Sequence, residues 1–136
     1  MALELVVVTP EGEAFSQAVQ QVVLPGEAGR FGVLESHERF LTPLVRGPMQ
    51  ILHDGGRSEW AAISSGFAEV DGRKVVVLVD GCALASEIDR GASENRRAEA
   101  ARELASLADT PENAGERLRL EEVVAKAELE VEVAGL

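Results

Sequence analysis

Three glycines spaced three residues apart form the first pattern in the chain that could bind a ligand. Gly26, Gly29 and Gly32 lie in one short stretch, and glycine-rich loops hold phosphate groups when a helix begins directly after them. No helical pattern follows Gly32, so the helix dipole that such a loop exploits is missing. We therefore interpret these glycines as turn positions and not as a phosphate-binding loop.

One histidine stands next to a carboxylate, in the pair His37-Glu38. Adjacent residues of an extended segment point to opposite sides, which argues against a general acid–base dyad. A surface or capping role and a contact with a partner both remain open for His37. His53 borders a turn signal and is expected to be exposed to solvent. Cys82 lies in an apolar stretch without a neighbouring base, which predicts a small buried hydrophobe.

No catalytic motif is present in the sequence. The patterns GxxxxGK[ST], HExxH, GxSxG and CxxC are all missing, and each carries a defined chemistry where it occurs. The acidic runs Glu121-Glu122 and Glu128-x-Glu130-x-Glu132 are expected to be solvated faces, because no convergent third ligand for a metal is evident. We expect a protein that is not an enzyme, with no metal and no cofactor.

Short apolar runs separated by turn signals fill the first part of the chain. Turn signals such as Pro10-Glu11-Gly12, Asp54-Gly55-Gly56 and Asp71-Gly72 recur about every ten residues, with no helical stretch between them. This spacing predicts an antiparallel β-sandwich or barrel. Residues 75–79 are apolar at every position, so this strand is expected to lie between two layers and to be buried on both faces. Strands are expected at 3–9, 19–24, 46–53, 59–63, 67–70 and 74–79.

The second part of the chain has helical periodicity in two segments. A break at Asp109-Thr110-Pro111 separates them, and Thr110 is a good N-cap for a helix with Pro111 at its first position. A short connection between amphipathic helices predicts an antiparallel hairpin. The stripe of the first helix is expected to be Ala98, Ala101, Leu104, Ala105 and Ala108. The stripe of the second is expected to be Leu120, Val124, Ala127, Val131 and Ala134. Because alanine buries little apolar area, the hairpin should be weakly held.

Composition and charge limit the possible partners. The chain has 136 residues and a formal net charge of −11, which argues against nucleic-acid binding and against a polybasic membrane anchor. No apolar run is long enough for a membrane span, so direct lipid insertion is not expected. The first residues lack the basic region of a secretory signal. All aromatic residues precede residue 85, and this shift predicts two domains, a β-sandwich at 1–86 and a helical hairpin at 87–136.

The stretch Leu24-Pro25-Gly26-Glu27-Ala28-Gly29-Arg30-Phe31-Gly32-Val33-Leu34, followed by His37, resembles a known signature. The signature is L-P-G-x-x-G-x-F/L-G-V-L-P-G-H, from the epsilon subunit of F-type ATP synthases. Eleven positions fit without a gap. Ser65-Gly66-Phe67-Ala68-Glu69-Val70 is similar to the G-G-F-x-E-V of the same family. The order of the elements also agrees, so the resemblance covers essentially the whole chain.

This resemblance implies a fold and a function. The β domain would be a sandwich of about ten strands. The chain would be a non-catalytic subunit of the central stalk, or rotor, of a bacterial proton-translocating ATP synthase. It would link the gamma subunit to the membrane c-ring, as a peripheral protein on the cytoplasmic side of the inner membrane. Its helices would modulate ATP hydrolysis, with the alpha and beta subunits as further contacts. Residues at or near the c-ring and gamma interface would be Glu27, Arg30, Phe31, His37 and Glu38.

The sequence departs from the family pattern at three places. Glu35-Ser36 replaces the Pro-Gly before the histidine. At the first helix, where some relatives bind ATP, Ile88 and Asp89 are present but Ala92 replaces the arginine, and Arg97 would have to serve instead. Between residues 112 and 133 there are three basic residues against seven glutamates, whereas inhibitory relatives are basic there, so we expect weak inhibition. The alternative hypothesis is a free-standing nucleotide-binding β module with a regulatory helical tail.

Overall fold

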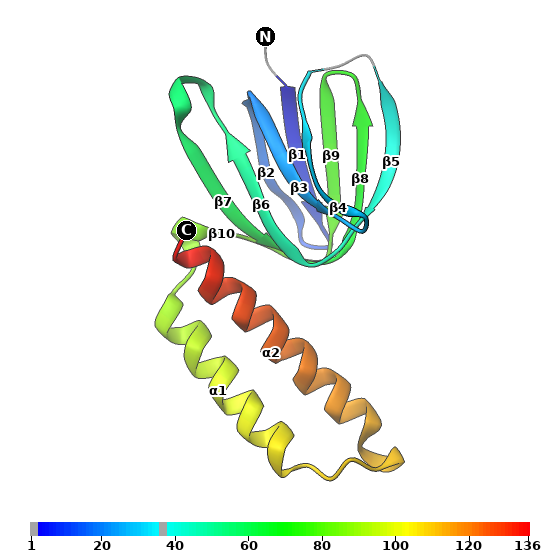
Figure 1. Ribbon diagram of the computed structural model, residues 1–136, viewed down its shortest axis with the longest axis vertical. Helices are drawn as coiled ribbons and strands as arrows, with labels where there is room; N and C mark the ends of the chain where they lie inside the picture. Colours follow the sequence, from blue (N-terminus) through cyan, green and yellow to red (C-terminus); the bar gives the residue numbers. More distant parts are fainter. Residues whose placement is uncertain (1–2, 36–37) are drawn as a thin grey trace. The chain divides into compact units, whose positions relative to one another are not determined.

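The computed structural model describes residues 3–35 and 38–136 of the chain. The chain divides into two compact units, Met1–Ala85 and Ser86–Leu136, and each is described by itself. The first unit contains strands and the second contains helices (Figure 1). None of the helices in the described residues combines the length and the apolar character that a membrane span requires.

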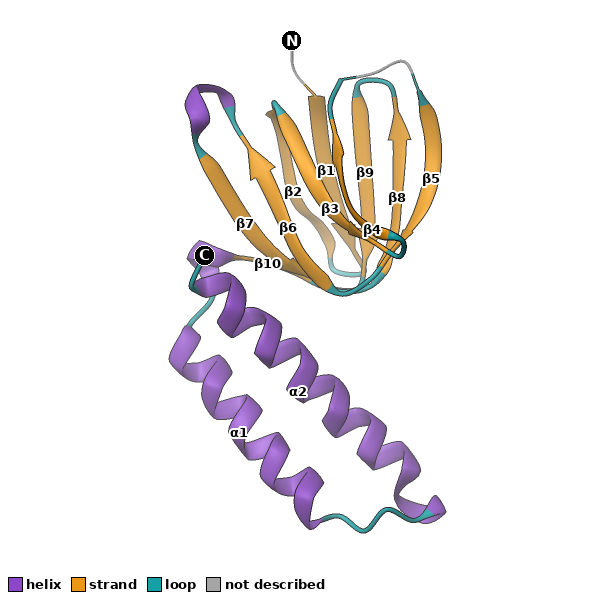
Figure 2. Cartoon of the chain, viewed as in Figure 1, coloured by secondary structure: helices purple, strands orange, loops and turns teal. Residues whose placement is uncertain are grey.

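The described part of the first unit forms a ten-stranded sheet that curls into a nearly closed sandwich (Figure 2). Its order is β10-β7-β6-β3-β5-β8-β9-β1-β2, with β4 paired to β3. Among these strands β1 and β9 pair in parallel and the other neighbours are antiparallel. The predicted β-sandwich is therefore confirmed. The strands are β1 Leu3–Thr9, β2 Gly12–Val19, β3 Gln21–Gly26, β4 Gly29–Val33, β5 Arg39–Leu44, β6 Gly47–Leu52, β7 Ser58–Ile63, β8 Gly66–Asp71, β9 Lys74–Val79 and β10 Cys82–Leu84.

Burial alternates along the strands, because successive side chains point to opposite faces. In β9, Val75 and Val77 are fully buried, whereas Leu78 is 44% exposed. The expectation that residues 75–79 are buried on both faces is therefore wrong. A strand that is apolar at every position need not be covered on both sides, and here one apolar face remains in contact with solvent.

The strand directions determine which turns share an end of the sandwich. The β3–β4 turn lies at the same end as the β1–β2 and β7–β8 turns, because β1 and β9 run in parallel and the other pairs are antiparallel. The β8–β9 turn lies at the opposite end, as Figure 1 shows. There the Gly72 amide donates to the carbonyl of Glu38 at 3.1 Å. Glu38 and the β3–β4 turn therefore lie at opposite ends.

His53 is buried, which contradicts the expectation of exposure. Its side chain is 8% exposed, and Nε2 lies 2.5 Å from Oε2 of Glu59 in β7. The 3-10 turn Asp54–Gly56 (η1) follows it, and the His53 amide donates to the Arg57 carbonyl. Because this turn folds the chain back onto β7, the imidazole meets a carboxylate and not water. Cys82 is half-buried and packs against the core.

The second unit contains the two predicted helices, α1 Arg90–Ser106 and α2 Ala114–Ala134. The short 3-10 turns Ala85–Glu87 (η2) and Pro111–Asn113 (η3) precede them. Side chains near the start of α1 contact the end of α2, so the helices are antiparallel. Pro111 begins the 3-10 turn and not α2 itself, and the Thr110 side chain makes no capping hydrogen bond.

The expected stripe of α1 is confirmed for Ala98, Ala101 and Leu104, which are half-buried, but not for its last two members. Ala100 is buried and Leu104 is half-buried, as the face toward α2 requires, whereas Ala105 and Ala108 are exposed. Leu107, the residue directly after α1, is half-buried. In α2, Leu120 and Ala127 are buried and Val124, Val131 and Ala134 are half-buried, which agrees with the expected seam.

Candidate functional site

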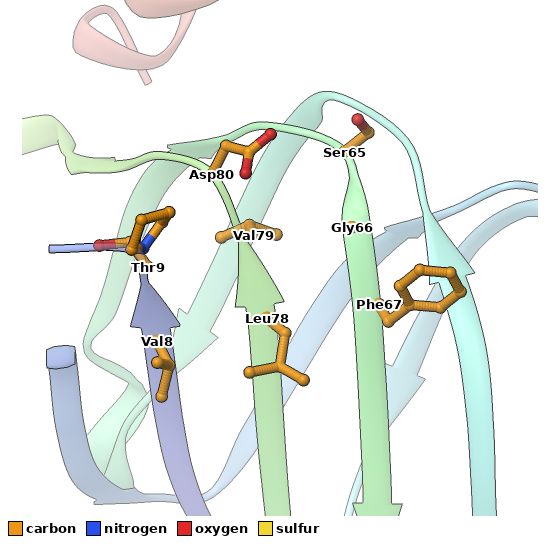
Figure 3. A pocket seen from close by; sticks show the side chains of 9 residues that line it. Val8, Thr9, Ser65, Gly66, Phe67, Leu78, Val79 and Asp80 are labelled. Atoms are coloured by element: carbon orange, nitrogen blue, oxygen red, sulfur yellow. The ribbon is translucent and has the colours of Figure 1, made fainter. Parts of the chain in front are cut away.

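An exposed apolar row crosses the outer face of the sandwich. The strand register places Phe67 of β8 beside Leu78 of β9, and Leu78 beside Val8 of β1. Pro43 of β5 extends the row on the other side of Phe67. Phe67 is 50% exposed and Leu78 is 44% exposed. We call these four residues the apolar row; Figure 3 shows its members Val8, Leu78 and Phe67 on three neighbouring strands.

The apolar row borders an open hollow of about 540 Å³ at the ends of the strands. Asp80 and Ser65 stand at its polar edge (Figure 3). On the same outer face, Glu69 follows Phe67 along β8 and is exposed. An apolar strip with a polar rim on a sheet surface is typical of a site that binds another protein. The rim is mainly acidic, so the partner surface should be apolar with basic residues around it.

Gly66 allows the strands beneath the row to approach closely. A Cβ atom at this position would lie 2.0 Å from the carbonyl oxygen of Leu78, which belongs to the backbone and cannot rotate away. Gly66 pairs with Val79 at the start of β8. Glycine is therefore required where β8 and β9 meet at the hollow.

The four described residues predicted to contact partners do not form one site. Glu27 lies in the exposed β3–β4 turn, at the end that also carries the hollow. Glu38 lies at the opposite end, beside the β8–β9 turn. The strand β4, which leads from one end toward the other, spans about 16 Å. His37 lies outside the described residues.

The other two predicted contact residues interact within the sandwich. The guanidinium of Arg30 lies over the ring of Trp60, 5.5 Å from its centroid, in a cation–π contact. Phe31 packs against the core and meets the ring of Phe40 edge-on, with centroids 6.3 Å apart. Both side chains therefore make contacts that hold β4 in the sandwich. The sequence pattern alone does not predict these contacts.

The three residues predicted to bind a nucleotide lie apart from one another, two of them before the first residue of α1 and one within the helix. Asp89 is the N-cap of α1, and its Oδ1 accepts a hydrogen bond from the Ala92 amide at 3.1 Å. Ile88 precedes it and is half-buried. Arg97 lies eight residues after Asp89, about 12 Å along the helix axis. The carboxylate of Asp89 thus satisfies a backbone donor of the first turn.

Removing the cap at Asp89 should loosen the first turn of α1. We expect Asp89→Ala to cost about 1 kcal/mol of helix stability, because the Ala92 amide loses its acceptor. Hydrogen exchange of the amides in the first turn measures this loss. Asp89→Asn is the matched control, since asparagine caps equally well; an Asn variant as destabilised as the Ala variant would contradict the role of the cap.

A buried polar group between the helices was missed by the sequence analysis. Glu130 is only 9% exposed, although it was expected to lie on a solvated face. Its Oε1 accepts a hydrogen bond from Oγ of the fully buried Ser93 at 3.2 Å. The signal was present in the spacing, because Glu130 follows Ala127 by three residues and so lies on the seam side of α2.

Two exposed carboxyl groups of the second unit have lowered pKa values. Hydrogen bonds from Arg119, at 2.6 and 3.1 Å, lower the pKa of Glu116. A backbone hydrogen bond, and then one from the Thr110 side chain, lower the pKa of Glu112. Stability from a lowered carboxyl pKa is present above the unfolded-state pKa and is lost as the pH falls. Acid should therefore weaken this end of the hairpin.

The exposed apolar row is a surface of the kind that binds other proteins. A nearly closed β-sandwich exposes an apolar strip, and a helical hairpin follows it in the chain. The described residues contain no cluster of three or more potential metal ligands. A family model described as "ATP synthase, Delta/Epsilon chain, beta-sandwich domain" matches residues 2–85. The chain belongs to this family.

Similar proteins support the same assignment. The ATP synthase epsilon chain of Prochlorococcus marinus is 30% identical over 135 residues, which cover 99% of each chain. That of Campylobacter curvus is 36% identical over 123 residues, covering 90% of this chain and 95% of the relative. The resemblance of this sequence to the epsilon subunit is thereby confirmed.

Solved structures share the fold. A chain in the mitochondrial ATP synthase of Euglena gracilis, in an assembly of OSCP, F1 and c-ring, has a TM-score of 0.66 at 20% identity; the match covers 98% of this chain and 78% of that one. A chain in the central stalk and c-ring of the Tetrahymena thermophila enzyme has a TM-score of 0.55 at 11% identity, with coverage of 98% and 97%. At these identities the likeness concerns the fold.

Proposed function

We propose that the chain is a non-catalytic rotor subunit in the central stalk of a bacterial proton-translocating ATP synthase. It links the gamma subunit to the c-ring. The sandwich at 1–86 makes these contacts, and the hairpin at 87–136 inhibits hydrolysis only weakly. The observation that carries the proposal is the exposed apolar row on a chain of this family. As part of the complex, the protein sits peripherally on the cytoplasmic side of the membrane.

The apolar row is the proposed contact with gamma. Phe67 and Leu78 expose about half of their side chains to water, and burying them against a partner is favourable. The acidic rim at Glu69 and Asp80 selects a partner surface with basic residues. The adjacent turn with Glu27 lies at the same end of the sandwich and extends this contact.

The opposite end of the sandwich is the proposed contact with the c-ring. Leu34 is 55% exposed there, after the end of β4. Two ion pairs brace this end, Arg73 with Glu35 at 3.2 Å and Arg39 with Asp71 at 2.9 Å. Separate ends for the two partners let one small domain join gamma and the ring without competition between them.

Co-purification tests the proposal. A tagged full-length chain, expressed at its natural level, should isolate a complex that contains gamma together with alpha and beta. A stable complex that lacks these subunits would contradict the proposal. The alternative, a free-standing nucleotide-binding module, requires saturable ATP binding at micromolar concentration without gamma, and the capping role of Asp89 does not favour it.

Removing the hairpin should leave ATP hydrolysis nearly unchanged. The segment 112–133 carries seven glutamates against Arg117, Arg119 and Lys126, so it is repelled by acidic surfaces of the catalytic subunits. We expect the assembled complex with residues 90–136 deleted to hydrolyse ATP at the rate of the intact complex. A large rise in ATPase activity on deletion would show strong inhibition and contradict this expectation.

A further inference from the structure

We infer that a polar clamp, formed by the buried Ser93 and Glu130 together with the exposed Arg96, holds α1 against α2 without any bound ligand. The inference concerns the second unit alone and does not depend on the proposed function. It assigns to these three side chains a part in holding the hairpin closed, in addition to its apolar seam.

The clamp joins the start of α1 to the end of α2. Ser93 Oγ donates to Glu130 Oε1 at 3.2 Å, and Arg96 Nη2 donates to Ser93 Oγ at 3.0 Å and to Glu130 Oε1 at 3.4 Å. Ser93 is fully buried, and the Glu130 side chain is 12% exposed. A buried carboxylate is costly unless it is paired and hydrogen-bonded. The clamp meets that requirement only while the helices are together and in this register.

A second polar contact closes the other end of the hairpin. Arg117 Nη1 of α2 donates to the Leu107 carbonyl at 2.8 Å and to the Leu104 carbonyl at 3.4 Å. Asn113 Nδ2 donates to the Ala108 carbonyl at 2.9 Å. A cation at these carbonyls is favourable, because the last turn of α1 carries the negative end of the helix dipole.

The seam between the two contacts combines small and larger apolar side chains. Ala100, Ala127 and Leu120 are buried there, and Leu104 and Val124 are half-buried. Because the alanines contribute little apolar area, the polar contacts at both ends add to what holds the hairpin closed. A buried hydrogen-bonded group also fixes register more strictly than an alanine stripe does.

Hydrogen exchange in the full chain, without nucleotide, tests the clamp. Glu130→Ala leaves the buried Ser93 hydroxyl without its acceptor, and we expect exchange of the seam amides at Ala100 and Ala127 to accelerate about tenfold. Ser93→Ala should accelerate it to a similar degree. Glu128→Gln, an exposed glutamate of the same helix, is the matched control and should leave the exchange rate unchanged.

The double variant shows whether Ser93 and Glu130 act through one shared interaction or contribute to stability independently. With Ser93→Ala and Glu130→Ala combined, exchange should be about as fast as in either single variant, because both remove one shared interaction. Effects that multiply, or single variants that exchange no faster than Glu128→Gln, would overturn the proposal. Millimolar ATP should leave the exchange rate of the unmodified chain unchanged; strong protection by ATP would show that closure needs a ligand and would also overturn it.

Discussion

Replacing Phe67 with aspartate should weaken the binding of the chain to the gamma subunit about 30-fold or more. Phe67 is the aromatic member of the apolar row, and aromatic residues at the centre of an interface commonly contribute 2 kcal/mol or more, equivalent to about 30-fold in affinity. The new carboxylate also adds charge to an acidic rim that already holds Glu69 and Asp80. Calorimetric titration of purified gamma with the full-length chain measures this affinity.

The control variant places the same change on a different exposed surface. Leu118 of α2 is 63% exposed, and Leu118→Asp should bind gamma nearly as tightly as the unmodified chain. Because Phe67 is half-exposed, its replacement should leave the sandwich folded, which circular dichroism checks. Equal affinities of Phe67→Asp and the unmodified chain would show that gamma binds elsewhere.

Replacing Gly66 with alanine should destabilise the sandwich strongly. The added Cβ would meet the Leu78 carbonyl oxygen at 2.0 Å, and this backbone atom can move only if the β8–β9 pairing shifts. We expect a loss of about 3 kcal/mol in the free energy of unfolding, typical of an overpacked site that cannot relax. For a domain of this size, the melting temperature should fall by about 10–20 °C.

Gly81 offers a matched control for the backbone clash. It follows β9 within the next turn, and a Cβ there would have no heavy atom within 4 Å. Gly81→Ala also keeps the amide that donates to Ser64 Oγ. Its melting temperature should therefore stay close to that of the unmodified chain. A Gly66→Ala variant that melts together with Gly81→Ala would contradict the close approach of β8 and β9.

The sequence predicted the architecture because its strongest signals are local. The turn at Asp71-Gly72 and the apolar run after it define the β8–β9 hairpin, and the break near Pro111 separates the helices. The sequence does not predict β4, because Gly29–Val33 contains two glycines and its pattern is typical of a turn. Its strand character comes from pairing with β3, a contact that local propensity does not encode.

The sequence predicts the residues of the candidate site less well than it predicts the fold. Residues 75–79 gave no indication that Leu78 faces solvent, since apolar residues occupy both faces of the strand. His53 and Glu130 were expected to be exposed, because a polar residue beside a turn or in an acidic run usually is. Their burial depends on Glu59 and Ser93, which only the folded chain brings into contact.

Functional replacement tests the central claim most directly. Membrane vesicles are prepared from cells that normally carry this chain, with the chain removed from their ATP synthase, and ATP-driven proton pumping is measured before and after adding back the purified full-length protein. A rotor subunit that joins gamma to the c-ring should restore pumping, and Phe67→Asp should restore it only at much higher concentration. Vesicles that pump equally well without the chain, or that stay uncoupled when it is bound to gamma, would contradict the account.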